Sequence, residues 1–263
     1  MTLTPIAVDL ALYPAQFHDL LNSAEKIYDS SCSPQARVIY VENEVGFFLK
    51  SAPKGTLERQ NIMTRYFHSI GLTAKAVTYF SDQNHDWLLT ERVLGHDCTN
   101  EKYMQQPERL VDTLAEQLRL LHATDFSACP VQSHTELYLE SAKRNMETGN
   151  YNKDHFPDSF GYKSAAEAWA VVEAHGHLLQ CNTLLHGDYC LPNILLDDWQ
   201  FSGFIDLDAG GVGDRHVDLF WAIWSIEFNL KTDKYRDRFL DAYGRGYVDE
   251  DMLRVVAAVE VFG

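Results

Sequence analysis

Residues 184–208 read LLHGDYCLPNILLDDWQFSGFIDLD, and this stretch decides the fold expected for the chain. Two carboxylates and one amide stand in it at fixed intervals: Asp188, Asn193 five residues later, and then Asp206. Apolar runs surround them, and residues 201–205 have the composition of a short buried strand that ends at Asp206. The pattern predicts a loop that presents Asp188 and Asn193, followed by a β-hairpin that presents Asp206.

This spacing suits the transfer of a phosphoryl group from ATP. Kinase catalytic loops have an Asp, an Asn five residues after it, and a further Asp on the next hairpin. Amide and carboxylate oxygens are hard ligands suited to Mg²⁺, and a second carboxylate can accept the proton of an attacking hydroxyl. We therefore predict Asp188 as the catalytic base and Asn193 and Asp206 as metal ligands. The alternative is a solvated loop with unrelated acidic residues, which the complete constellation disfavours.

Length, charge and cysteine content narrow the class of protein. The 263 residues, 46% of them hydrophobic, are enough for one small and one larger lobe. The net charge of −16 argues against a nucleic-acid partner and is compatible with a cationic small-molecule substrate, with plain solubility as the alternative reason for it. The five cysteines form no CxxC pair, which favours reduced thiols in a cytoplasmic protein.

Nothing in the sequence indicates a membrane or a protein partner. No window approaches 18 uninterrupted apolar residues, so we expect no membrane span. The first residues lack a basic region and a clear cleavage site, so we expect no signal peptide. No feature points to an obligate protein partner.

Hydrophobic periodicity divides the chain into a β-rich part and a helical part. The first part is expected to contain a helix over 8–28, a hairpin over 37–41 and 46–50, a helix over 57–70, and a hairpin over 76–80 and 87–91. The second part is expected to contain helices near 107–122, 135–146, 165–175, 218–227, 235–243 and 251–261. We predict an α+β, bilobal protein-kinase-like fold. It has a small β-rich nucleotide-binding lobe with one main helix (1–92), a linker (93–97), and a larger, mostly helical lobe (98–263) that carries the catalytic loop and the substrate-binding surface.

The nucleotide-binding residues are expected in the first lobe, although it has neither a P-loop motif nor a G-x-G-x-x-G motif. Lys50 ends a strand where kinases place the lysine that binds the α- and β-phosphates. The helix that follows offers Glu58 or Gln60 as its partner. The Ser33 hydroxyl, just before the first hairpin, is a candidate phosphate ligand, with an ordinary loop as the alternative.

The strand that leads into the linker is the expected adenine site. Backbone groups near Arg92 and Val93 are placed to pair with the base, and Thr90 is placed to lie behind it. The alternative is a simple connecting strand, and the position favours the functional interpretation more than the residue types do.

Several motifs together resemble the aminoglycoside 3'-phosphotransferases. They are HGDYCLPN, FSGFIDLD, GVGDRHVDL, the strand end FFLK, the helix LERQNIMTRYF and the segment RLLHATDFSACP. The resemblance runs from about residue 33 to the C-terminus. HGDxxxxN alone is shared with choline, homoserine and macrolide kinases, whereas GFID followed by GDRxxD is narrower. The resemblance implies an ATP- and Mg²⁺-dependent transfer of the γ-phosphoryl group to a hydroxyl, expected to be the 3'-hydroxyl, of a cationic aminoglycoside, which gives antibiotic resistance.

The resemblance also implies acidic substrate-binding residues. They map to Asp154 and Asp158 in the insertion over 152–158, and to Glu260 near the C-terminus. Besides this thinner insertion, the chain departs from the family pattern in four places. Gln60 stands where the family has the glutamate partner of the strand lysine, and Asp208-Ala209 where it has Gly-Arg. Val259 stands where the family has an aspartate, and Gly263 is an extra last residue.

These departures leave two alternatives open. One is a kinase of another small hydroxyl compound, such as an amino alcohol or a sugar. The other, from a different class, is a nucleotide-binding module with little catalysis.

Overall fold

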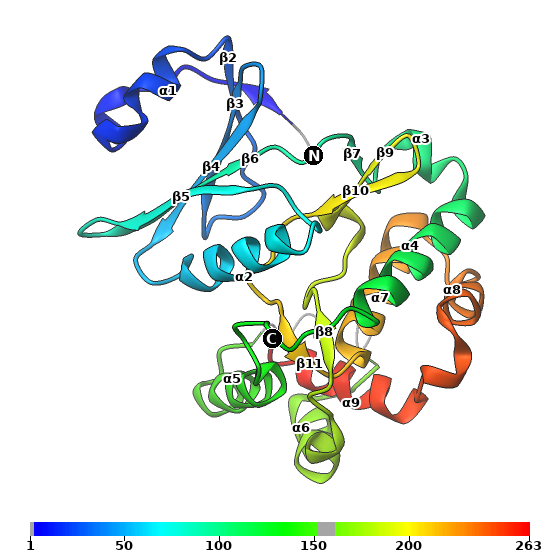
Figure 1. The fold of residues 1–263 in the computed structure, drawn as a ribbon. Coiled ribbons are helices and arrows are strands. Elements are labelled where there is room, and N and C mark those ends of the chain that lie inside the picture. The colour runs from blue at the N-terminus through cyan, green and yellow to red at the C-terminus, as the bar shows by residue number, and fades with distance from the viewer. Residues whose placement is uncertain (1–2, 152–160) are drawn as a thin grey trace. The chain divides into compact units, whose positions relative to one another are not determined.

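The computed structural model describes residues 3–151 and 161–263, and the chain divides into two compact units (Figure 1). Unit 1 consists of Met1–Asp97 and Leu195–Asp208, and unit 2 of Cys98–Ile194 and Ala209–Gly263. The hairpin that ends at Asp206 therefore belongs to unit 1, although it follows the catalytic loop in the sequence and our sequence-based boundary assigned it to the second lobe.

Unit 1 is built on an antiparallel sheet with the strand order β1-β2-β3-β4-β6-β5. Its strands are β1 (Thr4–Pro5), β2 (Lys26–Asp29), β3 (Arg37–Glu42), β4 (Phe47–Pro53), β5 (Ala76–Ser81) and β6 (His85–Glu91). A second sheet has the order β10-β9-β7 and consists of β7 (His96–Asp97), β9 (Ile194–Asp197) and β10 (Gln200–Phe204). Both predicted hairpins, β3–β4 and β5–β6, are confirmed.

Successive side chains of β4 face a buried core and the opposite side of the sheet in turn. Leu49 is buried in a core formed with the N-terminal segments η1 (Leu10–Leu12), η2 (Ala15–Phe17) and α1 (His18–Asn22). Lys50, the next residue, points to the opposite face because successive strand side chains alternate. There its register partner Leu88 packs with Leu57, at the start of α2 (Glu58–Ser69).

The continuous helix predicted over residues 8–28 is wrong. Short helical turns and α1 occupy the first part, and Lys26–Asp29 is strand β2, paired with β3. Pro14 explains the break, because it has no backbone N–H and its ring clashes with the preceding helical turn. Ile27 satisfies its apolar character in a strand instead, opposite Val41.

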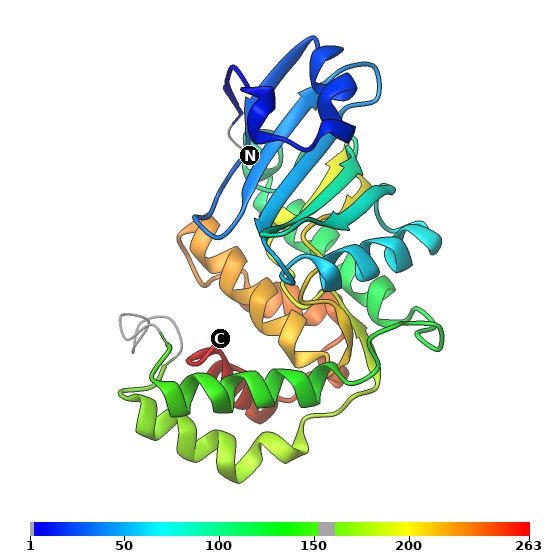
Figure 2. The ribbon, with the colours of Figure 1, turned by 90° about the vertical axis from the view of Figure 1, so that its left-hand side faces the viewer.

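Unit 2 is mostly helical (Figure 2). Its helices are α3 (Glu101–Met104), α4 (Pro107–His122), α5 (His134–Thr148), α6 (Ala165–His175), α7 (His216–Leu230), α8 (Arg236–Tyr243) and α9 (Glu250–Glu260), with 3₁₀ turns η4 (Gly176–Leu178), η5 (Leu191–Asn193) and η6 (Arg245–Tyr247). The small sheet β8 (Thr183–Leu185) and β11 (Gly211–Gly213) carries the catalytic loop at its end. A core with Val217, Val256 and Phe262 joins α5, α6, α7 and α9.

The predicted helices of this unit are confirmed, and their capping residues explain their limits. Pro107 opens α4, where its missing N–H costs nothing. The side chains of Ser164 and Asp249 accept backbone N–H groups at the starts of α6 and α9. An antiparallel sheet in unit 1 and helices in unit 2 confirm the predicted α+β class. Across the described ranges, no helix is both long and apolar enough to cross a membrane.

Candidate functional site

The catalytic loop follows β8 and depends on one glycine. Gly187 has φ +86°, and a Cβ atom on it would lie 2.2 Å from the Ala209 carbonyl oxygen. Only glycine has neither the Cβ nor the penalty for this left-handed conformation. Gly187 therefore allows the loop to turn against residue 209 and carry Asp188 out of the buried strand.

Asn193 holds the predicted base in place. Its Nδ2 donates to the backbone oxygen of Asp188 at 3.0 Å and to Asp188 Oδ2 at 2.8 Å. The Cys190 thiol, a weak donor, is also hydrogen-bonded to the Asp188 carboxylate. Within the described residues, no nitrogen or hydroxyl donates to Asp188 Oδ1, and the Asn193 amide oxygen accepts no hydrogen bond. The loop thus offers one carboxylate oxygen and one amide oxygen to incoming groups.

Asp218, at the start of α7, holds the backbone of this loop in place. It is fully buried, and its carboxylate accepts the backbone N–H groups of His186 at 2.8 Å and Gly187 at 2.7 Å. His122 Nε2 lies 3.1 Å from the same carboxylate, and His122 Nδ1 lies 2.8 Å from the Tyr243 hydroxyl. Burial opposes the charge of Asp218, but hydrogen bonding from His122 and His186 outweighs it and lowers the pKa of Asp218. Asp218 therefore holds the backbone of the catalytic loop through two N–H groups.

The predicted nucleotide residues of unit 1 meet at Asp206. Lys50 Nζ donates to Asp206 Oδ1 at 2.8 Å, and Gln60 Nε2 donates to the same oxygen at 3.2 Å. The strand before Asp206 is fixed to the end of α2, because the Phe204 N–H donates to the Leu72 carbonyl and Thr73 Oγ1 donates to the Phe204 carbonyl. Asp206 itself has φ +59°, a conformation that non-glycine residues adopt at an energetic cost and that is common at functional sites.

The expected contact between Gln60 and Lys50 is replaced by one with Asp206. Gln60 is 8% exposed, its amide nitrogen faces Asp206, and its Oε1 is buried without a hydrogen-bond partner among the described residues. Lys50 is neutralised by Asp206, so a second carboxylate on α2 is not needed to compensate its charge. A glutamine at position 60, where the family has a glutamate, therefore leaves Lys50 paired with a carboxylate.

The oxygen atoms that remain fit a hard cation. Both hydrogen bonds to Asp206 use Oδ1, and its side chain is 40% exposed, so Oδ2 is accessible. No cluster of three or more His, Cys, Asp or Glu side chains suited to a metal occurs in the part of the chain that the structure describes. Mg²⁺ commonly binds one or two carboxylates together with substrate phosphates and keeps several waters, so such a sparse protein set suits it.

The other nucleotide candidates also lie in unit 1. Thr90 is half-buried on β6, opposite Phe48. The Arg92 backbone N–H donates to the Gly46 carbonyl at 2.9 Å, which leaves Val93 as the candidate donor to a base. Ser33 is exposed and forms an isolated β-bridge with Ala36.

Glu260 is the predicted substrate residue that the structure describes, since Asp154 and Asp158 lie outside the described residues. Its Oε1 accepts the Tyr138 hydroxyl of α5 at 2.7 Å and Trp221 Nε1 of α7 at 3.0 Å. Burial raises the pKa of Glu260 to about 7; these two hydrogen bonds oppose the shift and the charge of Asp188 adds to it. Sequence reasoning missed Tyr138 and Trp221, because only the fold brings α5, α7 and α9 together.

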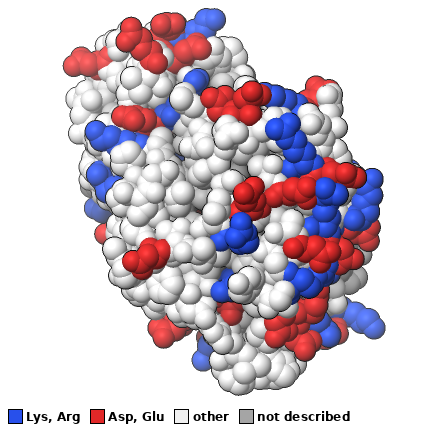
Figure 3. Space-filling model, turned by 45° about the vertical axis from the view of Figure 1, so that its right-hand side comes forward, with Lys and Arg blue, Asp and Glu red and all other residues white. Residues whose placement is uncertain are grey.

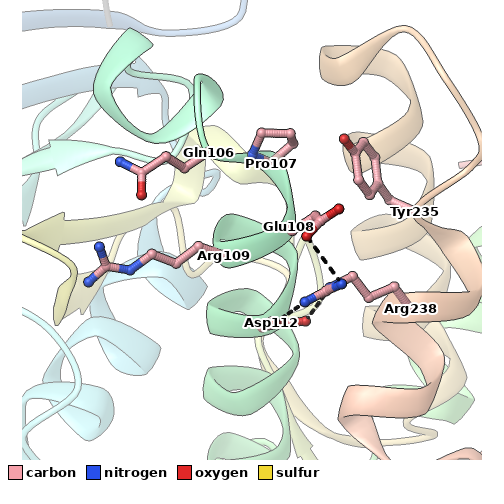
Figure 4. A pocket seen from close by; sticks show the side chains of 7 residues that line it. All are labelled: Gln106, Pro107, Glu108, Arg109, Asp112, Tyr235 and Arg238. Carbon is pink, nitrogen blue, oxygen red and sulfur yellow. Dashed lines mark hydrogen bonds and ion pairs between the residues drawn. The ribbon is translucent and has the colours of Figure 1, made fainter.

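An open pocket of about 490 Å³ lies elsewhere in unit 2, between α4 and α8 (Figure 4). Arg238 makes two 2.7 Å hydrogen bonds to Asp112 there and lies 3.5 Å from Glu108. Acidic and basic side chains alternate on the face of the molecule drawn in Figure 3. The charges of this pocket neutralise one another, so it is a brace between two helices rather than a candidate site.

Comparison with known proteins agrees with this geometry. A model of the phosphotransferase enzyme family matches residues 34–255. A probable aminoglycoside 3'-phosphotransferase of Lactococcus lactis subsp. lactis is 46% identical over 261 residues, 99% of each chain. An aminoglycoside 3'-phosphotransferase of Niallia circulans is 31% identical over 177 residues, 67% of each chain.

Two solved structures show the same fold at lower identity. The aminoglycoside-3'-phosphotransferase of type VIII aligns with a TM-score of 0.74 and 21% identity over 99% of this chain and 94% of its own. The aminoglycoside phosphotransferase APH(3'')-Id of Streptomyces rimosus aligns with a TM-score of 0.78 and 20% identity over 97% of this chain and 99% of its own. The resemblance that the sequence motifs indicated is thus confirmed, and the chain belongs to the phosphotransferase enzyme family.

Proposed function

We propose that this protein transfers the γ-phosphoryl group of Mg-ATP to the 3'-hydroxyl of an aminoglycoside, and thereby gives resistance to the drug. The observation that carries the proposal is the Asp188–Asn193 pair: a carboxylate fixed through one oxygen, with the other open to an acceptor hydroxyl. A relative that matches over 99% of its length and is named a probable aminoglycoside 3'-phosphotransferase supports the choice of acceptor. Because the reaction uses ATP, we place it in the cytoplasm.

In this proposal each unit contributes its own groups. Asp188 Oδ1 orients the acceptor hydroxyl and takes its proton as the oxygen attacks the γ-phosphorus; the bond from that phosphorus to the β,γ-bridging oxygen breaks, and ADP leaves with its electron pair. Lys50 binds the α- and β-phosphates, Val93 pairs with the base next to Thr90 and Arg92, and Ser33 is a further phosphate ligand. Asp206 and Asn193 would be the protein ligands of Mg²⁺. The bound ion would neutralise charge on the phosphate oxygens.

The acceptor is held by carboxylates. Glu260 is held in place by Tyr138 and Trp221, and its ionised form attracts ammonium groups. Asp154 and Asp158 complete the proposed acidic surface. An amino sugar with several ammonium groups suits this set better than a neutral sugar does.

The test measures ADP release with Mg-ATP and a panel of aminoglycosides, with and without a 3'-hydroxyl. Turnover only with the 3'-hydroxyl drugs is the expected result. Asp188→Ala should abolish turnover and retain ATP binding, whereas Asp112→Ala, on the exposed face of α4, should leave both unchanged. Wild-type rates in Asp188→Ala would contradict the assignment of the base.

A second candidate function is a kinase of another small hydroxyl compound. The amide of Gln60 on α2, which donates to Asp206 and stands where the family has a glutamate, favours it. A protein that binds ATP and is silent across the whole panel would support this candidate, and a screen of amino alcohols and sugars would follow. A binding module with little catalysis is not supported, because it would have no use for an oriented Asp188.

A further inference from the structure

Three aromatic side chains form a continuous row along α7. Trp221 and Trp224 have ring centroids 5.5 Å apart, and Trp224 stacks on Phe228 at 5.0 Å with an interplanar angle of 7°. The spacing i, i+3, i+7 places them on one side of the helix. We call this row the aromatic ladder.

The aromatic ladder is only partly covered: Trp221 packs against the core of unit 2, and the outer end of the row is exposed. Phe228 is 54% exposed, and Trp221 and Trp224 are half-buried. Single exposed apolar residues are ordinary on protein surfaces, but a contiguous row of large rings indicates a binding surface. A cation already lies on one ring, since Lys231 Nζ is 4.0 Å from the centroid of Phe228.

The inner end of the aromatic ladder adjoins the groups that handle the acceptor. Trp221 Nε1 donates to Glu260, and the Trp221 carbonyl lies 3.9 Å from Cys190 Sγ in the catalytic loop. Ser225, one turn after Trp221, accepts the Leu191 N–H of the same loop at 2.9 Å. The row therefore starts beside the catalytic loop and Glu260 and runs outward along α7.

We propose that the aromatic ladder is the platform on which the acceptor's amino-sugar rings stack during phosphoryl transfer. Aromatic faces pack well against the C–H faces of sugar rings, and they attract ammonium groups through the ring quadrupole. The carboxylates of Glu260 and Asp188 at the inner end complement the same cationic ligand. This inference rests on the proposed function and names residues that set acceptor affinity.

The test measures kcat and KM separately in variants of the ladder and compares them with those of wild type. Trp224→Ala should raise the KM for a 3'-hydroxyl aminoglycoside about tenfold, since desolvated cation–π and stacking contacts contribute on this scale. The kcat and the KM for ATP should stay within about twofold of wild type, because no described hydrogen bond joins Trp224 to the catalytic loop or to the nucleotide-binding residues. Trp224→Phe, which keeps a ring, should recover most of the affinity. Leu120→Ala, at an exposed apolar position of α4, is the control and should change nothing.

Calorimetric binding of the same aminoglycosides without ATP separates this inference from the proposed function. Weaker binding to Trp224→Ala than to wild type supports the ladder even for a drug that is not phosphorylated. If wild type turns over the drug and Trp224→Ala has the same acceptor KM, the inference about the ladder is overturned and the proposed function stands. Absence of both binding and turnover in wild type overturns both proposals. A change in oligomeric state in Trp224→Ala, with unchanged acceptor affinity, would identify the ladder as a contact between copies of the chain and overturn it as well.

Discussion

The substitution Asp218→Asn tests whether the catalytic loop is held by a buried charge. Asp218 accepts two backbone N–H groups of the loop and pairs with His122. An amide at this position keeps one acceptor oxygen and presents a donor in place of the other. Either His186 or Gly187 then loses its partner, and His122 loses the carboxylate.

The cost follows from these contacts. A buried donor left without a partner costs roughly 1–3 kcal/mol, and the substitution affects two such donors, one backbone N–H of the loop and the His122 ring. Burial lowers the pKa of His122, so its contact with Asp218 is a hydrogen bond to one charge rather than a pair of charges. We expect a loss of about 4 kcal/mol in the free energy of unfolding, or ~10 °C in Tm. The kcat should also fall about 100-fold, because a displacement of the order of 1 Å at a reacting group has that effect.

Urea-induced unfolding and steady-state kinetics of the same preparation measure both quantities. The control is Asp112→Asn, since Asp112 pairs with Arg238 at an exposed site and such pairs contribute about 0–1 kcal/mol. The pKa of Asp218 is lowered in the folded protein, so its stabilisation is present above the ordinary carboxyl pKa and is lost as the pH falls through the folded value. An Asp218→Asn protein within 1 kcal/mol of wild type at pH 7.5 would refute the reasoning.

Three further substitutions probe neighbouring features. Gly187→Ala places a Cβ against the Ala209 carbonyl, so we expect a kcat at least ~100-fold lower; unchanged kinetics would mean that the loop relaxes freely. Gln60→Leu removes a hydrogen bond and a buried unpartnered oxygen together, so stability should change by less than ~1 kcal/mol while the KM for Mg-ATP rises; a large loss on thermal unfolding would contradict this. Glu260→Gln removes a carboxyl whose pKa burial raises from 4.5 to about 7. A carboxyl whose pKa is raised by folding stabilises the folded protein at pH values below its pKa in the unfolded chain, and that stabilisation is lost as the pH rises through 7. Wild type should therefore lose more stability between pH 4.5 and 8 than the variant does. Parallel curves of stability against pH would argue against a buried carboxyl.

Much of the fold was predictable because local patterns and tertiary packing agree. The limits of α4 and α6 match the prediction at both ends, since Pro107 and Ser164 mark their starts and apolar residues recur with helical period. The helix predicted over 8–28 was wrong because the apolar residues of this segment fit both a helical and a strand period. Pro14 favoured short turns, and pairing with the edge of β3 favoured a strand. The short strand β11 was not predicted, because three residues carry no periodic pattern.

The candidate site was predictable where its residues lie close together in the sequence. Asp188, Asn193 and Asp206 stand at intervals that the reaction itself requires, so one sequence was enough to select them. The contact of Gln60 with Asp206, and that of Tyr138 with Glu260, join residues more than a hundred positions apart. Such contacts depend on how elements pack, and no local pattern contains them.

The two sides of α7 suggest how this family can change its acceptor without changing its chemistry. Asp218 and Ser225, seven residues apart on one side, hold the backbone of the catalytic loop and are buried. Trp224 and Phe228 lie on the adjoining side, make no described hydrogen bond, and are joined to Trp221 by ring contacts. In our proposal, substitutions on the second side would alter what the helix presents to the acceptor and would leave the position of Asp188 unchanged. Because the buried side is constrained by the loop and the exposed side is not, acceptor preference can vary along α7 at little cost to phosphoryl transfer.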